Sequence, residues 1–377
     1  MAALFAERHR RLAEAMDRCG AWPGRSPWVR EAMDAVPRHL FAPDRLWRPD
    51  GGVFAPVDRE VDVCRWAEAV YPDPETPTVT QVVAGREAAG LPCQGVVADM
   101  LDALGPKPGQ RVLELGTGTG WTAALLAHRT GPDRVTSVEV DAGLASAAQK
   151  RLETAGVRVA VELGDGTAGH PRSAPYDGVI AAYAVDRIPW AWVAQTRPGG
   201  RIVTPWGRLG HVALTVAGDG RSASGWVRGL ARFPPARGTR PALEDFALLR
   251  AARPECAERS WERDPGALRE DRHLRFALRV ALPDVRIAAR ADGPGEVTAQ
   301  LHDGRSSWAT LSVRPGQAPT ALQGGPRRLA DELEQAWDGW LEAGSPDLHE
   351  FGLTVESADC QYAWALDQET GPRWLLS

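Results

Sequence analysis

The sequence has no long apolar run and no excess of positive charge, and its first sixteen residues are not an apolar segment. No run reaches the roughly 18 apolar residues of a membrane-spanning helix. Residues 1–16, MAALFAERHRRLAEAM, carry charge in every turn, unlike a secretory signal. Lysine and arginine number 44 against 49 aspartates and glutamates, and this net charge of −5 disfavours a dedicated nucleic-acid binder. We therefore expect a cytoplasmic protein whose partner is neither a membrane nor a nucleic acid.

Cysteine is scarce, and its distribution argues against two kinds of site. The five cysteines are widely spaced, odd in number and form no C-x-x-C pair: Cys19, Cys64, Cys93, Cys256 and Cys360. This pattern is typical of a reducing compartment and disfavours both a disulfide framework and structural zinc. The eight histidines are also scattered, so we predict no metal site.

The length and composition favour a globular protein with two or three domains. The chain has 377 residues, of which 44% are hydrophobic and 25% charged, and these values exclude a wholly disordered chain. Shifts in composition predict four parts: an N-terminal helical and loop segment on the substrate side (1–95), a cofactor-binding core (96–233), a Pro-rich, charged linker (234–267) and a C-terminal α+β accessory domain (268–377).

Short apolar runs alternate with helical patterns through the core. They predict strands at 111–116, 134–141, 157–165, 178–185 and 199–207, with helices between them. This alternation predicts right-handed β-α-β units, and hence an α/β fold with a doubly wound, mostly parallel sheet. Residues 50–95 show no regular period and are expected to form a long, irregular functional loop.

The accessory domain shows a mixture of strand and helix patterns. Short apolar runs predict strands at 274–280, 285–290, 297–303 and 307–313. Residues 326–344 predict an amphipathic helix with Trp337 and Trp340 on its apolar face. These indoles are either the core of the domain or a surface that recognises a peptide.

The strongest motif is ELGTGTGW, residues 114–121, directly after an apolar strand and at the start of a helix. Its glycines allow a sharp turn and close approach to a ligand, and the helix start offers free N–H groups. The spacing G-x-G-x-G after an acidic residue is typical of S-adenosylmethionine (SAM) methyltransferases; a nucleotide site and a structural turn are the alternatives. The candidate cofactor residues of this loop are Glu114, Gly116, Thr117, Gly118 and Gly120.

Two further strand ends contribute candidate cofactor residues. Glu139 ends the second predicted strand, 19 residues after Gly120, where a carboxylate can accept both ribose hydroxyls; Val140 follows it. Asp165 and Gly166 end the third strand in the segment GDGT. Asp165 is placed to accept from the adenine amino group, and Gly166 allows a close turn. Each alone would be an ordinary strand-end residue, but together they predict one SAM site.

The motifs together resemble the protein-L-isoaspartate O-methyltransferase family. RVLELGTGTGWTAALLA, SVEVD, GDGTAG and RPGGRIVTPWG follow its pattern, with AMDAVPRHLFAP upstream, over residues 28–220. The resemblance implies a Rossmann-like fold, SAM as methyl donor and an Asp or isoAsp carboxylate of a peptide or protein as acceptor. The tail, with GPRRLADELEQAWDGWLEAG, resembles extended actinobacterial members, several of which are associated with aspartimide formation in ribosomally made peptides.

One segment departs from the family pattern. The family carries Ser-Gln-Pro before the helix that precedes the glycine loop, and its hydroxyl helps to hold the substrate carboxylate. Here the segment reads GLPCQG, so Gln94 matches the family's Gln and Cys93 stands at the Ser; a shift by one residue places Pro92 there. Either way the hydroxyl is missing, and Thr78 and Thr80 are candidate substitutes.

Three functions are compatible with these observations. The first is SAM-dependent methylation of an Asp or isoAsp carboxylate in a ribosomally made precursor peptide. The methyl ester would then close to an aspartimide. The second is general repair of isoaspartyl residues in proteins. The third is a non-catalytic peptide-binding module derived from a methyltransferase. The missing hydroxyl favours the first, and the sequence gives no indication of an oligomeric state.

Overall fold

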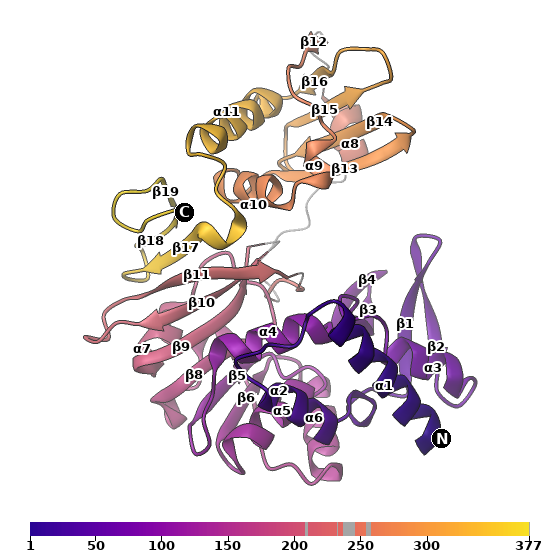
Figure 1. The fold of residues 1–377 in the computed structure, drawn as a ribbon, viewed down its shortest axis with the longest axis vertical. Helices are drawn as coiled ribbons and strands as arrows, with labels where there is room; N and C mark the ends of the chain where they lie inside the picture. The colour runs from indigo at the N-terminus through magenta and orange to yellow at the C-terminus, as the bar shows by residue number, and fades with distance from the viewer. Residues whose placement is uncertain (208–209, 232, 237–245, 254–257, 377) are drawn as a thin grey trace. The chain divides into compact units, whose positions relative to one another are not determined.

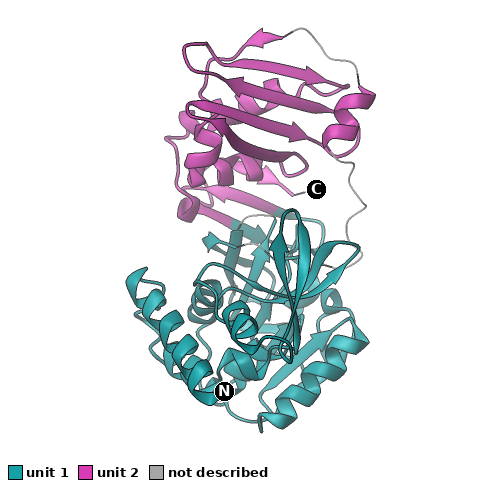
Figure 2. Ribbon diagram, turned by 90° about the vertical axis from the view of Figure 1, so that its right-hand side faces the viewer, with its two compact units in different colours: residues 1–236, 353–361 teal, residues 237–352, 362–377 magenta. Residues whose placement is uncertain are grey.

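The computed structural model describes residues 1–207, 210–231, 233–236, 246–253 and 258–376 (Figure 1). The chain divides into two compact units (Figure 2): unit 1 is residues 1–236 with 353–361, and unit 2 is residues 237–352 with 362–377. Each unit has its own cluster of buried apolar side chains. No helix among the described residues is long and apolar enough to cross a membrane.

Strands of unit 1 follow one another within one sheet in the order β17-β11-β10-β9-β8-β5-β6-β7. The strands from β7 through β9 pair in parallel, and β10 and β11 add antiparallel. The predicted α/β fold with a mostly parallel sheet is therefore confirmed. The strands are β5 (Val112–Leu115), β6 (Val135–Glu139), β7 (Ala160–Leu163), β8 (Tyr176–Ala181), β9 (Thr196–Trp206), β10 (Gly210–Val216), β11 (Ala223–Leu230) and β17 (Phe351–Val355).

The helices that connect these strands begin and end at sequence-encoded caps. Asp141 starts α6 by accepting hydrogen bonds from the N–H groups of Gly143 and Leu144. Gly105 ends α4 in the left-handed conformation, with φ of 57°. Figure 1 shows these helices against the sheet: α4 (Gln94–Leu104), α5 (Trp121–Thr130), α6 (Ala142–Thr154) and α7 (Trp190–Gln195).

The N-terminal segment is more regular than the sequence analysis predicts. Residues 45–91 form a four-stranded antiparallel sheet of order β2-β1-β3-β4, where an irregular loop is expected. Its two hairpins turn at Gly51–Gly52 and Ala84–Gly85, all with positive φ. The elements are α1 (Ala2–Arg18), α2 (Trp28–Ala35), η1 (Arg38–Leu40), β1 (Arg45–Asp50), β2 (Val53–Asp58), α3 (Val63–Val70), β3 (Thr78–Val83) and β4 (Arg86–Leu91).

Residues 353–361 bring the chain back to unit 1 after unit 2 has been formed. The Gln361 amide accepts from the Ile188 N–H (2.9 Å) and donates to the Ile188 carbonyl (2.7 Å). Arg187 donates to the Ala358 carbonyl at 2.6 Å. This returning segment therefore fixes the loop that follows β8.

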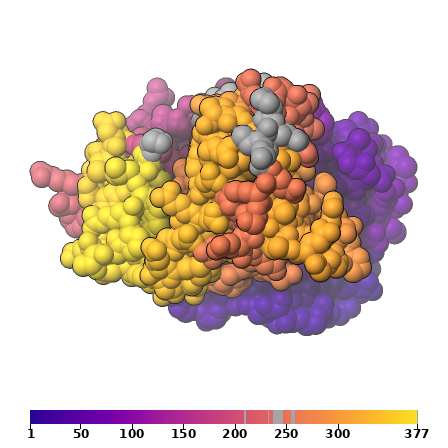
Figure 3. All heavy atoms as spheres, turned by 90° about the horizontal axis from the view of Figure 1, so that it is seen from above, coloured from indigo at the N-terminus to yellow at the C-terminus, as the bar shows by residue number. Residues whose placement is uncertain are grey.

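Unit 2 contains a third sheet, of order β12-β16-β15-β14-β13. Its core is formed by apolar side chains of these strands with those of α10 and α11, and Figure 3 shows one face of its surface. The elements are α8 (Phe246–Ala252), β12 (Arg259–Ser260), α9 (Ala267–Glu270), α10 (Arg272–Ala281), β13 (Arg286–Gly293), β14 (Glu296–His302), β15 (Trp308–Val313), β16 (Thr320–Gly324), α11 (Leu329–Glu342), η4 (Leu348–Glu350), β18 (Gln361–Ala365) and β19 (Arg373–Leu375).

Two expectations for this part of the chain differ from the structure. Residues 274–280, predicted as a strand, lie in α10, because Asp271 caps that helix by accepting from the N–H groups of His273 and Leu274. The expected linker 234–267 contains α8 and β12, and Trp261 belongs to the buried core. Cys256 and residues 237–245 lie outside the described residues.

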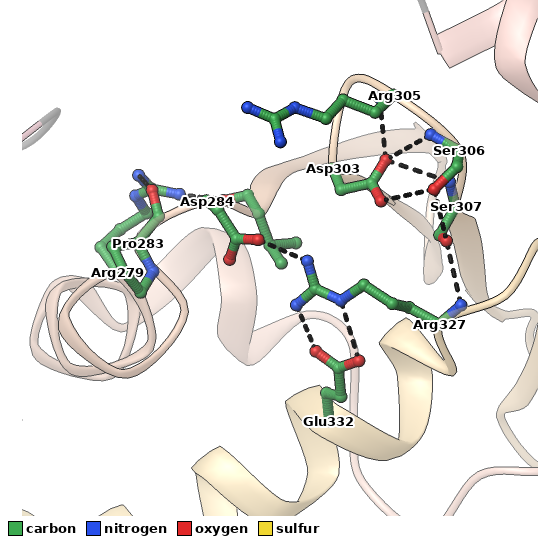
Figure 4. Close-up of polar contacts among 10 residues, drawn as sticks. Arg279, Pro283, Asp284, Asp303, Arg305, Ser306, Ser307, Arg327 and Glu332 are labelled. Atoms are coloured by element: carbon green, nitrogen blue, oxygen red, sulfur yellow. Dashed lines mark hydrogen bonds and ion pairs between the residues drawn. The ribbon is translucent and has the colours of Figure 1, made fainter. Parts of the chain in front are cut away.

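A polar network fixes the start of α11 to two turns of unit 2 (Figure 4). Arg327 forms ion pairs with Glu332 on α11 and with Asp284, which precedes β13. Asp303, after β14, accepts hydrogen bonds from the backbone N–H groups of residues 305–307. These contacts satisfy the charges within the unit, so the network has a structural role.

The two tryptophans of α11 also have structural surroundings. Trp337 is part of the buried core of unit 2, and Trp340 packs against that core. The Trp340 indole donates to the Pro346 carbonyl at 3.0 Å. Of the two interpretations of these indoles, the structure therefore favours packing within the domain.

Candidate active site

The predicted cofactor residues lie at the carboxyl ends of β5, β6 and β7, which are parallel neighbours in unit 1. The order of the sheet reverses at β5: β6 and β7 extend it on one side, and β8 and β9 on the other. Ligands of open α/β sheets bind outside the carboxyl ends of the strands at such a switch point. The fold thus brings the sequence motifs to one edge of the sheet.

The glycine loop links β5 to α5 through a chain of unusual backbone conformations. Gly116, Gly118 and Gly120 have φ values of 89°, 55° and 90°, which residues with side chains rarely adopt. Gly120 is the N-cap of α5, so the first N–H groups of the helix have no partner within it. The loop offers a ligand close backbone contact and hydrogen-bond donors.

Glu114 lies at the end of β5 and is only 1% exposed. Its Oε2 accepts a 2.5 Å hydrogen bond from Ser137, whose hydroxyl also pairs with Thr117 at 2.6 Å. Its Oε1 has no hydrogen-bond partner among the described residues. Burial, together with the charge of Glu139, raises the pKa of Glu114 to about 8, so this carboxyl is mostly protonated at neutral pH.

Glu139 joins the glycine loop to the end of β6. Its Oε2 accepts from the Gly118 N–H at 2.9 Å, and its Oε1 accepts from the Asp141 N–H at 3.1 Å. These two bonds hold both carboxylate oxygens at the mouth of the loop. Val140, the next residue, is 51% exposed and leaves an apolar surface beside them.

Asp165 and Gly166 form the neighbouring loop after β7. Asp165 is exposed, and its Oδ1 accepts from the Thr167 N–H at 2.9 Å. Gly166 is buried, and its carbonyl accepts from the Trp192 indole at 2.8 Å. The aspartate is therefore held by its own turn, and the backbone of the loop is held by α7.

These groups fit SAM, which carries a sulfonium cation, an amino acid end and an adenosine. Glu139 would hold the ribose hydroxyls, Asp165 the adenine amino group, and the loop with Glu114 the methionine end. The unpaired Oε1 of Glu114 and the open N–H groups of α5 are polar atoms that a bound ligand would satisfy.

A mostly apolar pocket continues from this site toward α4. It runs from Glu114 on β5 to side chains of α4, α5 and the end of β8. Its lining is Pro92, Val97, Met100, Glu114, Thr122, Ile180, Ala181, Ala182 and Phe233. An apolar enclosure next to a methyl donor excludes water from a reacting carboxylate.

The substrate-side segment lies directly against the glycine loop. The Gly90 carbonyl, on β4, is 3.9 Å from the position that a Cβ of Gly118 would take. Gln94 begins α4 two residues after Pro92 and is 1% exposed, yet neither polar atom of its amide has a hydrogen-bond partner in the part of the chain that the structure describes. Such a group is rare in a folded protein unless a ligand or a bound water satisfies it.

The other three substrate-side candidates differ in availability. Cys93 is half-buried, and burial raises the pKa of its thiol, which therefore stays a weak donor. The Thr80 hydroxyl is buried and has no hydrogen-bond partner within the described ranges, so it remains available. The Thr78 hydroxyl donates to the Ala69 carbonyl at 2.7 Å and accepts from Arg38 at 3.3 Å, so its proton is already used within the fold.

Sequence reasoning missed Arg38, which organises this segment. The guanidinium is 1% exposed and donates to the carbonyls of Val70 (3.1 Å) and Pro92 (2.7 Å). It lies over the Trp121 ring, 4.6 Å from the centroid, at the start of α5. Burial lowers its pKa to about 10, and it remains a cation that pairs with no carboxylate of the described residues. The sequence signal that could have identified Arg38 is its position in the segment VPRHLF, which resembles the family pattern.

Tyr183, in the loop after β8, was also missed. Its ring lies between the glycine loop and Gly166, and its hydroxyl is buried and has no hydrogen-bond partner among the residues that the structure describes. No motif marked this residue, because its role depends on two loops that are distant in sequence.

A parallel sheet with this glycine loop and these strand-end carboxylates defines a SAM-dependent methyltransferase. A sequence model described as protein-L-isoaspartate(D-aspartate) O-methyltransferase (PCMT) matches residues 52–222. The chain is 37% identical over 186 residues to the protein-L-isoaspartate O-methyltransferase of Methylorubrum extorquens, covering 49% of this chain and 69% of the relative. It is 36% identical over 202 residues to that of Pyrococcus abyssi, covering 53% and 80%.

The chain belongs to the protein-L-isoaspartate O-methyltransferase family. It is accordingly a SAM-dependent carboxyl O-methyltransferase. A solved structure titled protein-L-isoaspartate O-methyltransferase matches with a TM-score of 0.53 at 20% identity, covering 95% of this chain and 99% of that one. This likeness supports the fold, and the family assignment depends on the sequence matches.

Proposed function

We propose that the enzyme transfers the methyl group of SAM to the side-chain carboxylate of an isoaspartyl residue in a protein or peptide. The observation that carries this proposal is the unpaired, buried amide of Gln94 in the segment that lies against the glycine loop. An amide N–H can donate to one carboxylate oxygen and leave the other free to attack. The names of the relatives supply the isoaspartyl substrate.

The chemistry requires positioning rather than acid–base catalysis. SAM, when bound, supplies an electrophilic methyl group on sulfur. A carboxylate is already ionised at neutral pH and needs no base. The tasks of the chain are to hold the carboxylate oxygen in line with the methyl group and to exclude water. Gln94 and Thr80 serve the first task, and the apolar pocket beside Glu114 serves the second.

Arg38 supports this arrangement from inside the fold. Its bond to the Pro92 carbonyl fixes the segment that leads into Gln94. Its charge has no carboxylate among its contacts with the described residues, and it adds a positive potential close to Cys93 that the charge of Glu75 opposes in part. Arg38 is thus a positioning residue rather than a catalytic one.

A second candidate function is modification of one dedicated peptide at an Asp, followed by closure to an aspartimide. The missing hydroxyl at Cys93 and the occupied hydroxyl of Thr78 favour it, because both weaken the local hold on a generic carboxylate. Binding energy would then come from contacts remote from the reacting group. Once the ester has formed, the next backbone nitrogen attacks and methanol leaves.

Labelled SAM tests these functions directly. The full chain is incubated with a panel of short isoaspartyl peptides, matched Asp peptides and any peptide precursor encoded beside the gene. Label across the isoaspartyl panel supports the first function. Label confined to one Asp peptide, with later loss of methanol by mass spectrometry, supports the second. Label in none supports a binding module without catalysis.

A further inference from the structure

Tyr183 bridges the two loops that bind the cofactor. A Cβ on Gly116 would lie 2.9 Å from the Tyr183 Cδ1 atom, and a Cβ on Gly166 would lie 2.4 Å from its hydroxyl oxygen. The ring therefore extends from the glycine loop to the loop after β7. Glycine at both positions is what leaves space for it.

The ring is held in this place by α7. Tyr183 and Trp192 make an edge-to-face contact with centroids 6.2 Å apart. Trp192 is fully buried, and its indole donates to the Gly166 carbonyl at 2.8 Å. The phenol is thus positioned by a side chain that is itself fixed to the cofactor loop.

The buried hydroxyl of Tyr183 makes no hydrogen bond to the described residues of the free protein. Burial and the nearby charges of Asp165 and Glu139 raise the pKa of Tyr183, so the phenol stays protonated and remains a donor. An unpaired buried hydroxyl costs free energy that a ligand can recover.

The side chains around this hydroxyl are complementary to it. Glu139 and Asp165, as carboxylates, can only accept hydrogen bonds from a ligand. An adenosine has both donors, on the ribose and the amino group, and acceptors, on the ring nitrogens and ribose oxygens. A side-chain donor beside the two carboxylates would therefore complement the acceptor atoms of an adenosine.

We propose that Tyr183 is an adenosine-binding residue, whose hydroxyl donates a hydrogen bond to an acceptor atom in the adenosine part of SAM. The inference rests on SAM as the cofactor and does not depend on the identity of the methylated substrate. The competing interpretation is that the ring occupies the cofactor's place and must move before SAM binds.

Binding measurements on purified full-length protein separate the two. SAM, S-adenosylhomocysteine and adenosine are titrated calorimetrically into the wild type, Tyr183→Phe and Tyr183→Ala. We expect Tyr183→Phe to lower the affinity for each of the three ligands by a similar factor of about ten. Tyr183→Ala should lower these affinities at least as much. Unchanged binding by Tyr183→Phe with tighter binding by Tyr183→Ala would establish the blocking ring and overturn the proposal.

The pattern among the ligands tests the adenosine assignment itself. A loss confined to SAM, with S-adenosylhomocysteine and adenosine unaffected, would place the phenol at the sulfonium and contradict it. Tyr176→Phe is the matched control, because its hydroxyl, at the start of β8, is already bonded to the His170 carbonyl. That variant should bind all three ligands as the wild type does.

Thermal unfolding without ligand distinguishes a binding role from a structural one. Tyr183→Phe removes a buried hydroxyl that has no partner, so the melting temperature should stay the same or rise. A lower melting temperature with unchanged affinity would show that the hydroxyl serves the fold and would reject the proposal. These readouts are independent of methyl transfer, so they remain valid if the proposed substrate is wrong.

Discussion

The Ser137 hydroxyl on β6 donates a 2.5 Å hydrogen bond to the buried Glu114 carboxyl on β5. Burial raises the pKa of Glu114 from 4.5 to about 8. The native state therefore keeps a proton that the unfolded state loses above about pH 5. Protonation of Glu114 thus contributes to the stability of the native state. The contribution is fully present below the pKa of the unfolded state, 4.5, and is lost as the pH rises through the native pKa of about 8.

Glu114→Gln should therefore stabilise the free protein at neutral and higher pH. Glutamine needs no proton to be neutral, so the gain should be on the order of a few kcal/mol at pH 8 and small near pH 4. Denaturant unfolding across this pH range measures it. Glu153→Gln, on the exposed side of α6, is the control, and an equal pH dependence in both variants would contradict the assigned pKa.

Glu139→Ala should weaken SAM binding. The variant loses an acceptor for the cofactor and also the bonds that hold Gly118 and Asp141, so about 1.5–3 kcal/mol of binding free energy should be lost. Calorimetry with SAM checks this. Glu153→Ala should bind as the wild type does, and unchanged affinity in Glu139→Ala would remove this carboxylate from the site.

Cys93→Ser should improve turnover of short isoaspartyl peptides. Serine restores a stronger donor at the half-buried position before Gln94, and one better hydrogen bond is worth about tenfold in kcat/KM. Steady-state kinetics with a labelled methyl group measure the change. Cys19→Ser, at an exposed position, should have no effect. If Cys93→Ser leaves kcat/KM unchanged, the thiol is not near the acceptor carboxylate.

Arg38→Met should destabilise the protein and disorder the substrate side. It leaves the buried carbonyls of Val70 and Pro92 without donors, at a cost of about 2–4 kcal/mol. Thermal unfolding measures this loss. Arg30→Met removes only exposed contacts with Asp17 and a neighbouring ring, and should cost far less. Similar losses in the two variants would mean that the buried bonds of Arg38 contribute little.

The core of unit 1 was predictable because its strands are short apolar runs followed by glycine or an acid. The hairpin of β1 and β2 was missed, although Asp50-Gly51-Gly52 is a strong turn signal, because its strands carry charges and prolines instead of a clear alternation. The helix α10 was missed because Leu274, Phe276, Leu278 and Val280 recur at every second position, which favours a strand, while the cap Asp271 favours a helix.

The site shows the same division between local and distant signals. Glu114 and Glu139 lie at the carboxyl ends of their strands and Asp165 lies just after one, so their gathering at one edge follows from parallel pairing alone. The Thr78 hydroxyl is occupied because it bonds to Ala69 and Arg38, which belong to other elements. Tyr183 owes its place to two glycines far away in the chain. Such contacts become visible only when the loops are placed in space.

The return of residues 353–361 to unit 1 has a consequence for how the enzyme comes into being. Gln361 forms hydrogen bonds with both backbone groups of Ile188, a few residues after Tyr183. It leaves the ribosome only after nearly all of unit 2 has been made. The catalytic unit cannot complete itself during synthesis, as an ordinary N-terminal domain can. A nascent chain halted within unit 2 would contain every cofactor motif. It would still lack the hydrogen bonds from Gln361 that fix Ile188 in the loop after β8.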